Sequence, residues 1–141
     1  MLKRSPKEIF RAVSDSKELA MMLPGIHTVE VDNSKAEVPG GKGCVRVCTF
    51  EQGMALTEDI RYWDPGTAYA YSVRAPNPVG VENHVAVFHV ADDGHGGTLL
   101  TWNHYFDHMA VEQAVPAVNA MMTEILGKLI ASHGGQLVAS N

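Results

Sequence analysis

Two short helical patterns open the chain. The segment 5–8 (SPKE) combines an N-cap serine, a proline at the first helical position and a glutamate in the capping-box position, and apolar residues then follow at helical spacing. The segment 14–16 (SDS) interrupts this pattern, and Asp15 or Ser16 can cap a second short helix. We expect that helix to run through Met22 and to stop at Pro24 and Gly25.

From residue 26 the apolar pattern changes to a period of two. Turns rich in glycine, proline and aspartate divide it into segments 26–31, 43–50, 54–63, 67–74, 81–91 and 98–106, each typical of a strand. The turns are short, which makes neighbouring strands antiparallel. The loop 75–80 contains two prolines and cannot join a sheet interior.

After Asp107 the pattern becomes helical again and runs to about His133. Apolar residues recur at spacings of three and four, and Gly134 and Gly135 end the helix. A helix with so broad an apolar face needs a sheet to cover it. The pattern therefore predicts an α+β domain over residues 1–141, in which an antiparallel sheet packs one face on a long C-terminal helix.

Composition narrows the function classes. The formal net charge is −5 with no basic run, so we expect no nucleic-acid partner. No stretch approaches ~18 consecutive apolar residues, so we expect no membrane span. The N-terminus lacks the apolar core of a signal peptide, which favours a cytoplasmic protein. Cys44 and Cys48 lie four apart on one face of a strand, too far to bridge, and read as small buried hydrophobes.

Several motifs occur in an order that resembles one superfamily. They are SPKEIF at 5–10, LPGI at 23–26, GCVR at 43–46, EDI at 58–60 with DP at 64–65, and GTLLTW at 97–102. Together they resemble the START-like, helix-grip (SRPBCC) superfamily, which includes polyketide cyclase/dehydrase-like, lipid-transfer and pollen-allergen-like proteins. The resemblance implies a curved antiparallel sheet of six to seven strands wrapped around the C-terminal helix, with a ligand cavity between them.

The superfamily usually begins with a full strand before the first helix. Here only residues 1–4 could supply it. The strand is then a stub, the true start lies upstream, or the neighbouring edge stays unpaired. Because an unpaired edge invites another chain, a homodimer is possible.

Strand parity identifies candidate site residues, because alternate residues share one face. Facing the helix we expect Ile60, Phe88, Leu100, Trp102 and Phe106, with Glu58, Tyr62, His84, Ala86, Thr98 and His104, and also Arg46, Cys48, Phe50, Tyr69 and Tyr71. From these and the helix face we select as ligand-binding candidates Arg46, Glu58, Tyr71, His84, Phe88, Trp102, His104, Met121, Met122 and Ile125.

The polar candidates have two interpretations each. Arg46 and Glu58 either pair across adjacent strands or contact a ligand, and the two are compatible. His84 and His104 are either satisfied imidazoles or proton carriers. Glu58 and the two histidines could bind a metal in principle, but the spacing carries no metal motif, so we predict no metal and no cofactor.

Three functions remain open. The first is binding of a small, largely apolar molecule in the cavity. The second is a cofactor-free polyketide cyclase or dehydratase that uses Glu58 or His104 as acid or base. The third is an accessory module that binds another protein.

Overall fold

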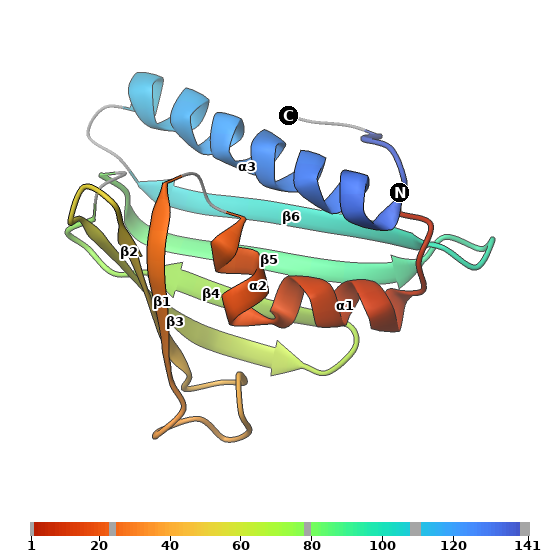
Figure 1. The fold of residues 1–141 in the computed structure, drawn as a ribbon, viewed down its shortest axis with the longest axis horizontal. Coiled ribbons are helices and arrows are strands. Elements are labelled where there is room, and N and C mark those ends of the chain that lie inside the picture. The colour runs from red at the N-terminus through yellow and green to blue at the C-terminus, as the bar shows by residue number, and fades with distance from the viewer. Residues whose placement is uncertain (1, 23–24, 78–79, 108–110, 139–141) are drawn as a thin grey trace.

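The computed structural model describes residues 2–22, 25–77, 80–107 and 111–138 (Figure 1). The elements, in chain order, are α1 (Pro6–Ser14), α2 (Ser16–Met21), β1 (Ile26–Asp32), β2 (Val45–Phe50), β3 (Ala55–Asp64), β4 (Ala68–Val73), β5 (Glu82–Asp92), β6 (Thr98–Asp107) and α3 (Val111–His133). The predicted elements are thus confirmed, with ends that shift by a few residues. Leu23 and Pro24 at the predicted helix stop, residues 78–79 of the proline loop and residues 108–110 before α3 lie outside the described ranges.

The capping signals in the sequence form the predicted contacts. Ser5 and Glu8 make a capping box, in which the Glu8 backbone N–H donates to Ser5 Oγ and the Ser5 N–H donates to Glu8 Oε2 at 3.0 Å. Asp15 Oδ1 accepts from the backbone N–H groups of Lys17 at 3.1 Å and Glu18 at 3.0 Å, and so caps α2. These contacts fix where the two short helices begin.

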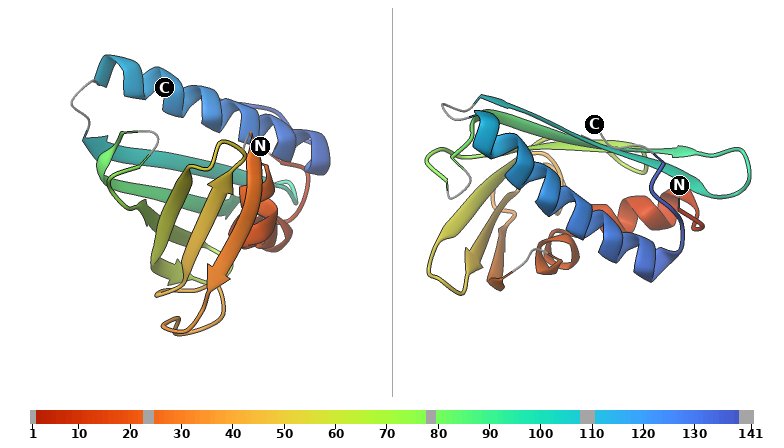
Figure 2. Two further views of the ribbon diagram at one scale, coloured as in Figure 1. Left: turned by 60° about the vertical axis from the view of Figure 1, so that its left-hand side comes forward. Right: turned by 90° about the horizontal axis from the view of Figure 1, so that it is seen from above.

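Within the described ranges six strands form one sheet in the order β1-β2-β3-β4-β5-β6, and every neighbouring pair is antiparallel. The sheet curves, and all three helices lie on its concave side (Figure 2). The helix α3 crosses the sheet obliquely next to β6, while α1 and α2 lie side by side below it (Figures 1 and 2). This is the α+β, helix-grip arrangement that the sequence predicted.

A bulge in β3 changes which of its residues face the helix. The register to β4 shifts between Ile60 and Tyr62, so the strand gains one residue and its alternation reverses. The prediction that Tyr62 faces the helix is therefore wrong, because this residue is 54% exposed. Trp63 turns inward instead and packs against Phe10, with ring centroids 5.3 Å apart.

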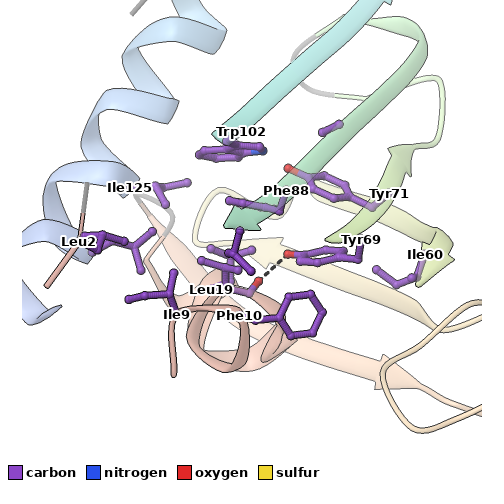
Figure 3. Close-up of a cluster of buried hydrophobic side chains, with 14 of the residues drawn as sticks. Leu2, Ile9, Phe10, Leu19, Ile60, Tyr69, Tyr71, Phe88, Trp102 and Ile125 are labelled. Atoms are coloured by element: carbon purple, nitrogen blue, oxygen red, sulfur yellow. Dashed lines mark hydrogen bonds between the residues drawn. The ribbon is translucent and has the colours of Figure 1, made fainter. Parts of the chain in front are cut away.

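Aromatic rings from three strands form the centre of the core (Figure 3). Phe88 stacks on Trp102 at 4.6 Å and on Tyr69 at 5.3 Å between ring centroids. The Tyr69 hydroxyl donates to the backbone carbonyl of Val13, one of the last carbonyls of α1, which the helix itself cannot satisfy. Tyr69 thereby joins the sheet to the first helix.

The outer edge of β6 is nearly bare in the described part of the chain. Leu2 and Thr98 exchange two backbone hydrogen bonds of 2.8 Å, and Leu2 also forms a bridge to Gly135. Because strand residues direct their N–H and C=O groups alternately to the two sides, those of Leu100, Trp102, His104 and Phe106 point the same way as those of Thr98. Leu2 thus covers only the beginning of this edge.

Neither cysteine is bonded to the other. Cys44 and Cys48 are free and buried, as the strand spacing predicted. No helix among the described residues has the length and apolar character that a membrane crossing requires.

The Tyr69 hydroxyl gives a direct test of the core. Tyr69→Phe removes one oxygen and leaves the Val13 carbonyl buried without this partner, so the free energy of unfolding should fall by about 1–2 kcal/mol. Urea denaturation would measure it. Tyr62→Phe, at the exposed site beside the bulge, is the matched control and should change stability by less than about 0.5 kcal/mol. Equal effects of both substitutions would contradict this view of the core.

Candidate functional site

Two spaces lie beside α3, one inside the concave face of the sheet and one at the β6 edge. The first is an inner cavity of about 50 Å³, lined by Leu19, Arg46, Cys48, Leu56, Glu58, Tyr71, Val73, Val81, His84, Trp102, His104, Val118, Met121 and Ile125. The second is a groove of about 630 Å³ between β6, α3 and the segment after α3. Trp102, His104 and Val118 line both, so the cavity and the groove adjoin at these residues.

Most of the predicted ligand-binding residues meet at the inner cavity. Eight of them line it: Arg46, Glu58, Tyr71, His84, Trp102, His104, Met121 and Ile125. Met122 lines the groove instead. Phe88 is fully buried within the ring stack and lines neither space. That these residues bind a ligand stays a prediction.

Arg46 and Glu58 are direct cross-strand partners on β2 and β3. The predicted pairing is confirmed, since Arg46 Nε donates to Glu58 Oε2 in a buried ion pair. The guanidinium carbon of Arg46 also lies 4.6 Å from the centroid of the Tyr71 ring, within cation–π distance. Burial is the largest single effect and lowers the pKa of the Arg46 guanidinium. Glu58, by its charge and its hydrogen bond, acts together with Tyr69 and Tyr71 in the opposite direction, and the net result is a raised pKa. The arginine is therefore held charged inside the fold.

His84 and His104 form a chain of hydrogen bonds that starts at the backbone. The Val73 N–H donates to His84 Nδ1 at 3.1 Å, and His84 Nε2 lies 2.9 Å from His104 Nδ1. Burial lowers the pKa of His84 to about 4. Burial and the neighbouring His84 lower the pKa of His104 to about 3. Both imidazoles are thus neutral near pH 7.

Three buried polar atoms have no hydrogen-bond partner among the described residues. They are Arg46 Nη1, Trp102 Nε1 and His104 Nε2, and all three belong to side chains that line the inner cavity. A buried polar group without a partner is costly, and most such groups bond to protein or to ordered water. A cavity of about 50 Å³ can hold one or two water molecules or the polar end of a larger molecule. The cavity is therefore a polar recess in an apolar wall.

The sequence did not predict the groove, because it indicated only one cavity, between the sheet and the C-terminal helix. Its apolar walls come from residues on both faces of β6, from α3 and from the tail, including Leu99, Leu100, Val115, Leu126, Ile130, Leu137 and Val138. Strand parity placed Leu99 on the far face, and the residues after His133 carried no pattern. Leu99 is 43% exposed and Val138 is 61% exposed, so much of this apolar surface is open to solvent.

Among the described residues, no three histidine, cysteine, aspartate or glutamate side chains gather in a way that could hold a metal ion. Glu58, His84 and His104 all line the inner cavity, but Glu58 is engaged by Arg46, and the histidines are joined to each other.

A family model described as polyketide cyclase / dehydrase and lipid transport matches residues 1–134. A search among curated proteins finds no match to this chain. Solved structures share its fold at low sequence identity. The protein XoxI from Bacillus cereus is 19% identical, with a TM-score of 0.76 over 94% of this chain and 89% of that one.

Two further structures extend the likeness. Norcoclaurine synthase from Thalictrum flavum, in complex with dopamine and hydroxybenzaldehyde, is 20% identical, with a TM-score of 0.64 over 96% of this chain and 84% of that one. Ara h 8.0201 is 20% identical, with a TM-score of 0.62 over 92% of each chain. Likeness at this level of identity concerns the fold alone.

The buried ion pair of Glu58 can be tested against the exposed ion pair of Asp59, the next residue of β3. Glu58→Gln leaves the Arg46 charge buried without its counter-charge, so the free energy of unfolding should fall by about 3 kcal/mol or more. Asp59→Asn, which breaks the exposed pair with Arg74, should cost less than about 1 kcal/mol. Denaturant titration of both variants measures the difference. Similar losses would show that the buried pair has no special role in stability.

The lowered pKa values of the two histidines predict acid sensitivity. As the pH falls below 6.5 the unfolded chain binds protons first, while the folded histidines stay neutral down to about 4 and 3. Stability should therefore fall with pH, by roughly 2 kcal/mol per histidine at about pH 4.5. Urea titrations across this range would show the slope. His104→Phe should remove about half of it, whereas His89→Gln, at an exposed position of β5, should leave it unchanged.

Proposed function

This chain belongs to the polyketide cyclase / dehydrase and lipid transport family, and on that premise we propose that it binds a small, largely apolar molecule between α3 and the concave face of the sheet. The apolar body of the ligand lies in the groove beside β6. Its polar end reaches the inner cavity past Trp102 and His104, which line both spaces.

The size of the groove carries this proposal. Pockets for small molecules usually measure about 300–1,000 Å³ and have mostly apolar walls with a few polar groups. The groove, at about 630 Å³, falls within that range and its walls are mainly leucine, isoleucine, valine and methionine side chains. The inner cavity, at about 50 Å³, is too small for such a molecule by itself. The two spaces therefore serve different parts of one ligand.

Binding accounts for the polar groups better than catalysis does. Glu58 Oε2 accepts from Arg46, and His104 Nδ1 lies within hydrogen-bond distance of His84, so these two of the atoms that could take a proton already have partners. Acid–base catalysis needs a group within hydrogen-bond reach of the substrate proton. The cyclase or dehydratase alternative, with Glu58 or His104 as acid or base, stays a prediction, as does the accessory module.

Two neighbouring positions on α3 test where the ligand lies. Asn119 lines the groove and Ala120 is exposed outside it. Asn119→Trp should fill part of the groove and raise the dissociation constant for the neutral dye Nile red at least about tenfold, equal to about 1.4 kcal/mol. Ala120→Trp places the same side chain on the same helix and should leave the constant unchanged. Fluorescence titration measures both.

Native mass spectrometry of freshly purified protein adds an independent check. A bound small molecule should appear with the unmodified protein and with Ala120→Trp, and should be lost in Asn119→Trp. If neither the dye nor a co-purified molecule responds to Asn119→Trp, the ligand does not occupy the groove and the proposal fails.

A further inference from the structure

Two hydrogen bonds, from Val73 on β4 to His84 on β5 and from His84 to His104 on β6, fix which nitrogen of each histidine ring carries the proton. A backbone N–H can only donate, so His84 Nδ1, which receives the Val73 N–H at 3.1 Å, must be unprotonated. The proton of neutral His84 is then on Nε2, which lies 2.9 Å from His104 Nδ1 and donates to it. His104 Nδ1 is therefore also unprotonated, and the proton of His104 is on Nε2. This direction follows from geometry alone.

The unpartnered atom of His104 is thus a donor. The other two unpartnered atoms, Arg46 Nη1 and Trp102 Nε1, are also N–H groups and can only donate. The three side chains gather around Tyr71. The Arg46 guanidinium carbon is 4.6 Å from the Tyr71 ring centroid, the Trp102 and His104 ring centroids are 4.8 Å apart, and the centroid of His104 is 6.3 Å from that of Tyr71.

We propose that the inner cavity binds a carbonyl oxygen of the ligand, through N–H groups of Arg46, Trp102 and His104, and that His84 is the positioning residue that makes His104 a donor. The inference rests on the proposed function, because it names the polar end of the molecule whose apolar body fills the groove. An aromatic ketone, quinone or ester has the required chemistry, an oxygen that accepts and does not donate.

Charge favours a neutral oxygen over a carboxylate. The charge of Arg46 is balanced by Glu58, and the two histidines carry none, so the cavity is neutral as a whole. Desolvation of an anion in such a place is costly. Glu58 also lines the cavity and could attract a ligand ammonium, which makes a cationic ligand the sharpest alternative. The Tyr71 hydroxyl can donate or accept, so it suits either ligand.

The first experiment needs no ligand. NMR spectra of the histidine ring nitrogens in protein labelled with nitrogen-15, recorded near neutral pH, report which nitrogen of each ring is protonated. We expect His84 and His104 both to carry the proton on Nε2. In His84→Phe, His104 should lose this preference for Nε2. A proton on Nδ1 of His104 in the unmodified protein would overturn the inference whatever binds.

The second experiment compares two probes of one shape, methyl naphthyl ketone and isopropenylnaphthalene, which differ by an oxygen in place of a methylene group. The ketone should bind about tenfold more tightly, because its oxygen can accept hydrogen bonds from the N–H groups of the cavity and the methylene group cannot. The indole N–H signal of Trp102 should shift with the ketone and not with the alkene, and the indole signal of Trp63 should shift with neither.

Variants separate a positioning role from a structural one. The readout is the ratio of the two dissociation constants, which a general loss of stability would not change. His84→Phe should reduce the ketone preference about threefold, and Trp102→Phe, which keeps an aromatic ring but removes the pyrrole ring with its N–H, should do the same. His89→Gln, at an exposed site on the same strand as His84, should leave the ratio unchanged.

The outcomes distinguish the inference from the function beneath it. If the ketone and the alkene bind equally, the groove binds apolar molecules but the cavity does not recognise a carbonyl oxygen, and the inference alone fails. Tighter binding of naphthylethylamine than of the ketone would assign the polar contact to Glu58 and would also overturn it. If none of the probes binds, the proposed function falls together with the inference.

Discussion

A charged pair on the concave face of the sheet sets the conditions for the rest of the site. Arg46 and Glu58 face each other on adjacent strands, and both are shielded from solvent. A buried pair of this kind adds little stability compared with apolar residues of equal volume, because desolvation offsets the attraction between the charges. The buried pair does, however, need polar or aromatic groups around it. Tyr71 covers the guanidinium, and the cavity keeps a space beside it.

The regular part of the fold could be predicted because it depends on periodicity. The alternation on β2 and β3 placed Arg46 and Glu58 on one face, and antiparallel pairing then brought them together. The bulge between Ile60 and Tyr62 could not be predicted, since no glycine or other turn signal marks the extra residue. It exchanged the expected positions of Tyr62 and Trp63 and so completed the ring cluster around Phe10.

The sequence pattern predicted which residues lie at the site, but not the hydrogen bonds between them. Parity alone put His84 and His104 on the helix-facing side of the sheet. The bond between their rings depends on how β5 pairs with β6, with Ala86 opposite His104, and a pattern of alternation does not reveal that pairing. The two spaces were also beyond prediction, because the volume left by side chains depends on how they pack. Phe88 stacks on Trp102 in the core, and the larger space lies beside β6, where Trp102 lines it and Phe88 does not.

The bare edge of β6 has a consequence for assembly. The groove and this edge belong to the same residues, since Leu100, Trp102, His104 and Phe106 line the groove while their backbone groups point outward. An added strand would lie about 4.8 Å from β6 and would run along the mouth of the groove. A strand of a second chain added at this edge would therefore compete with a ligand in the groove for the same surface.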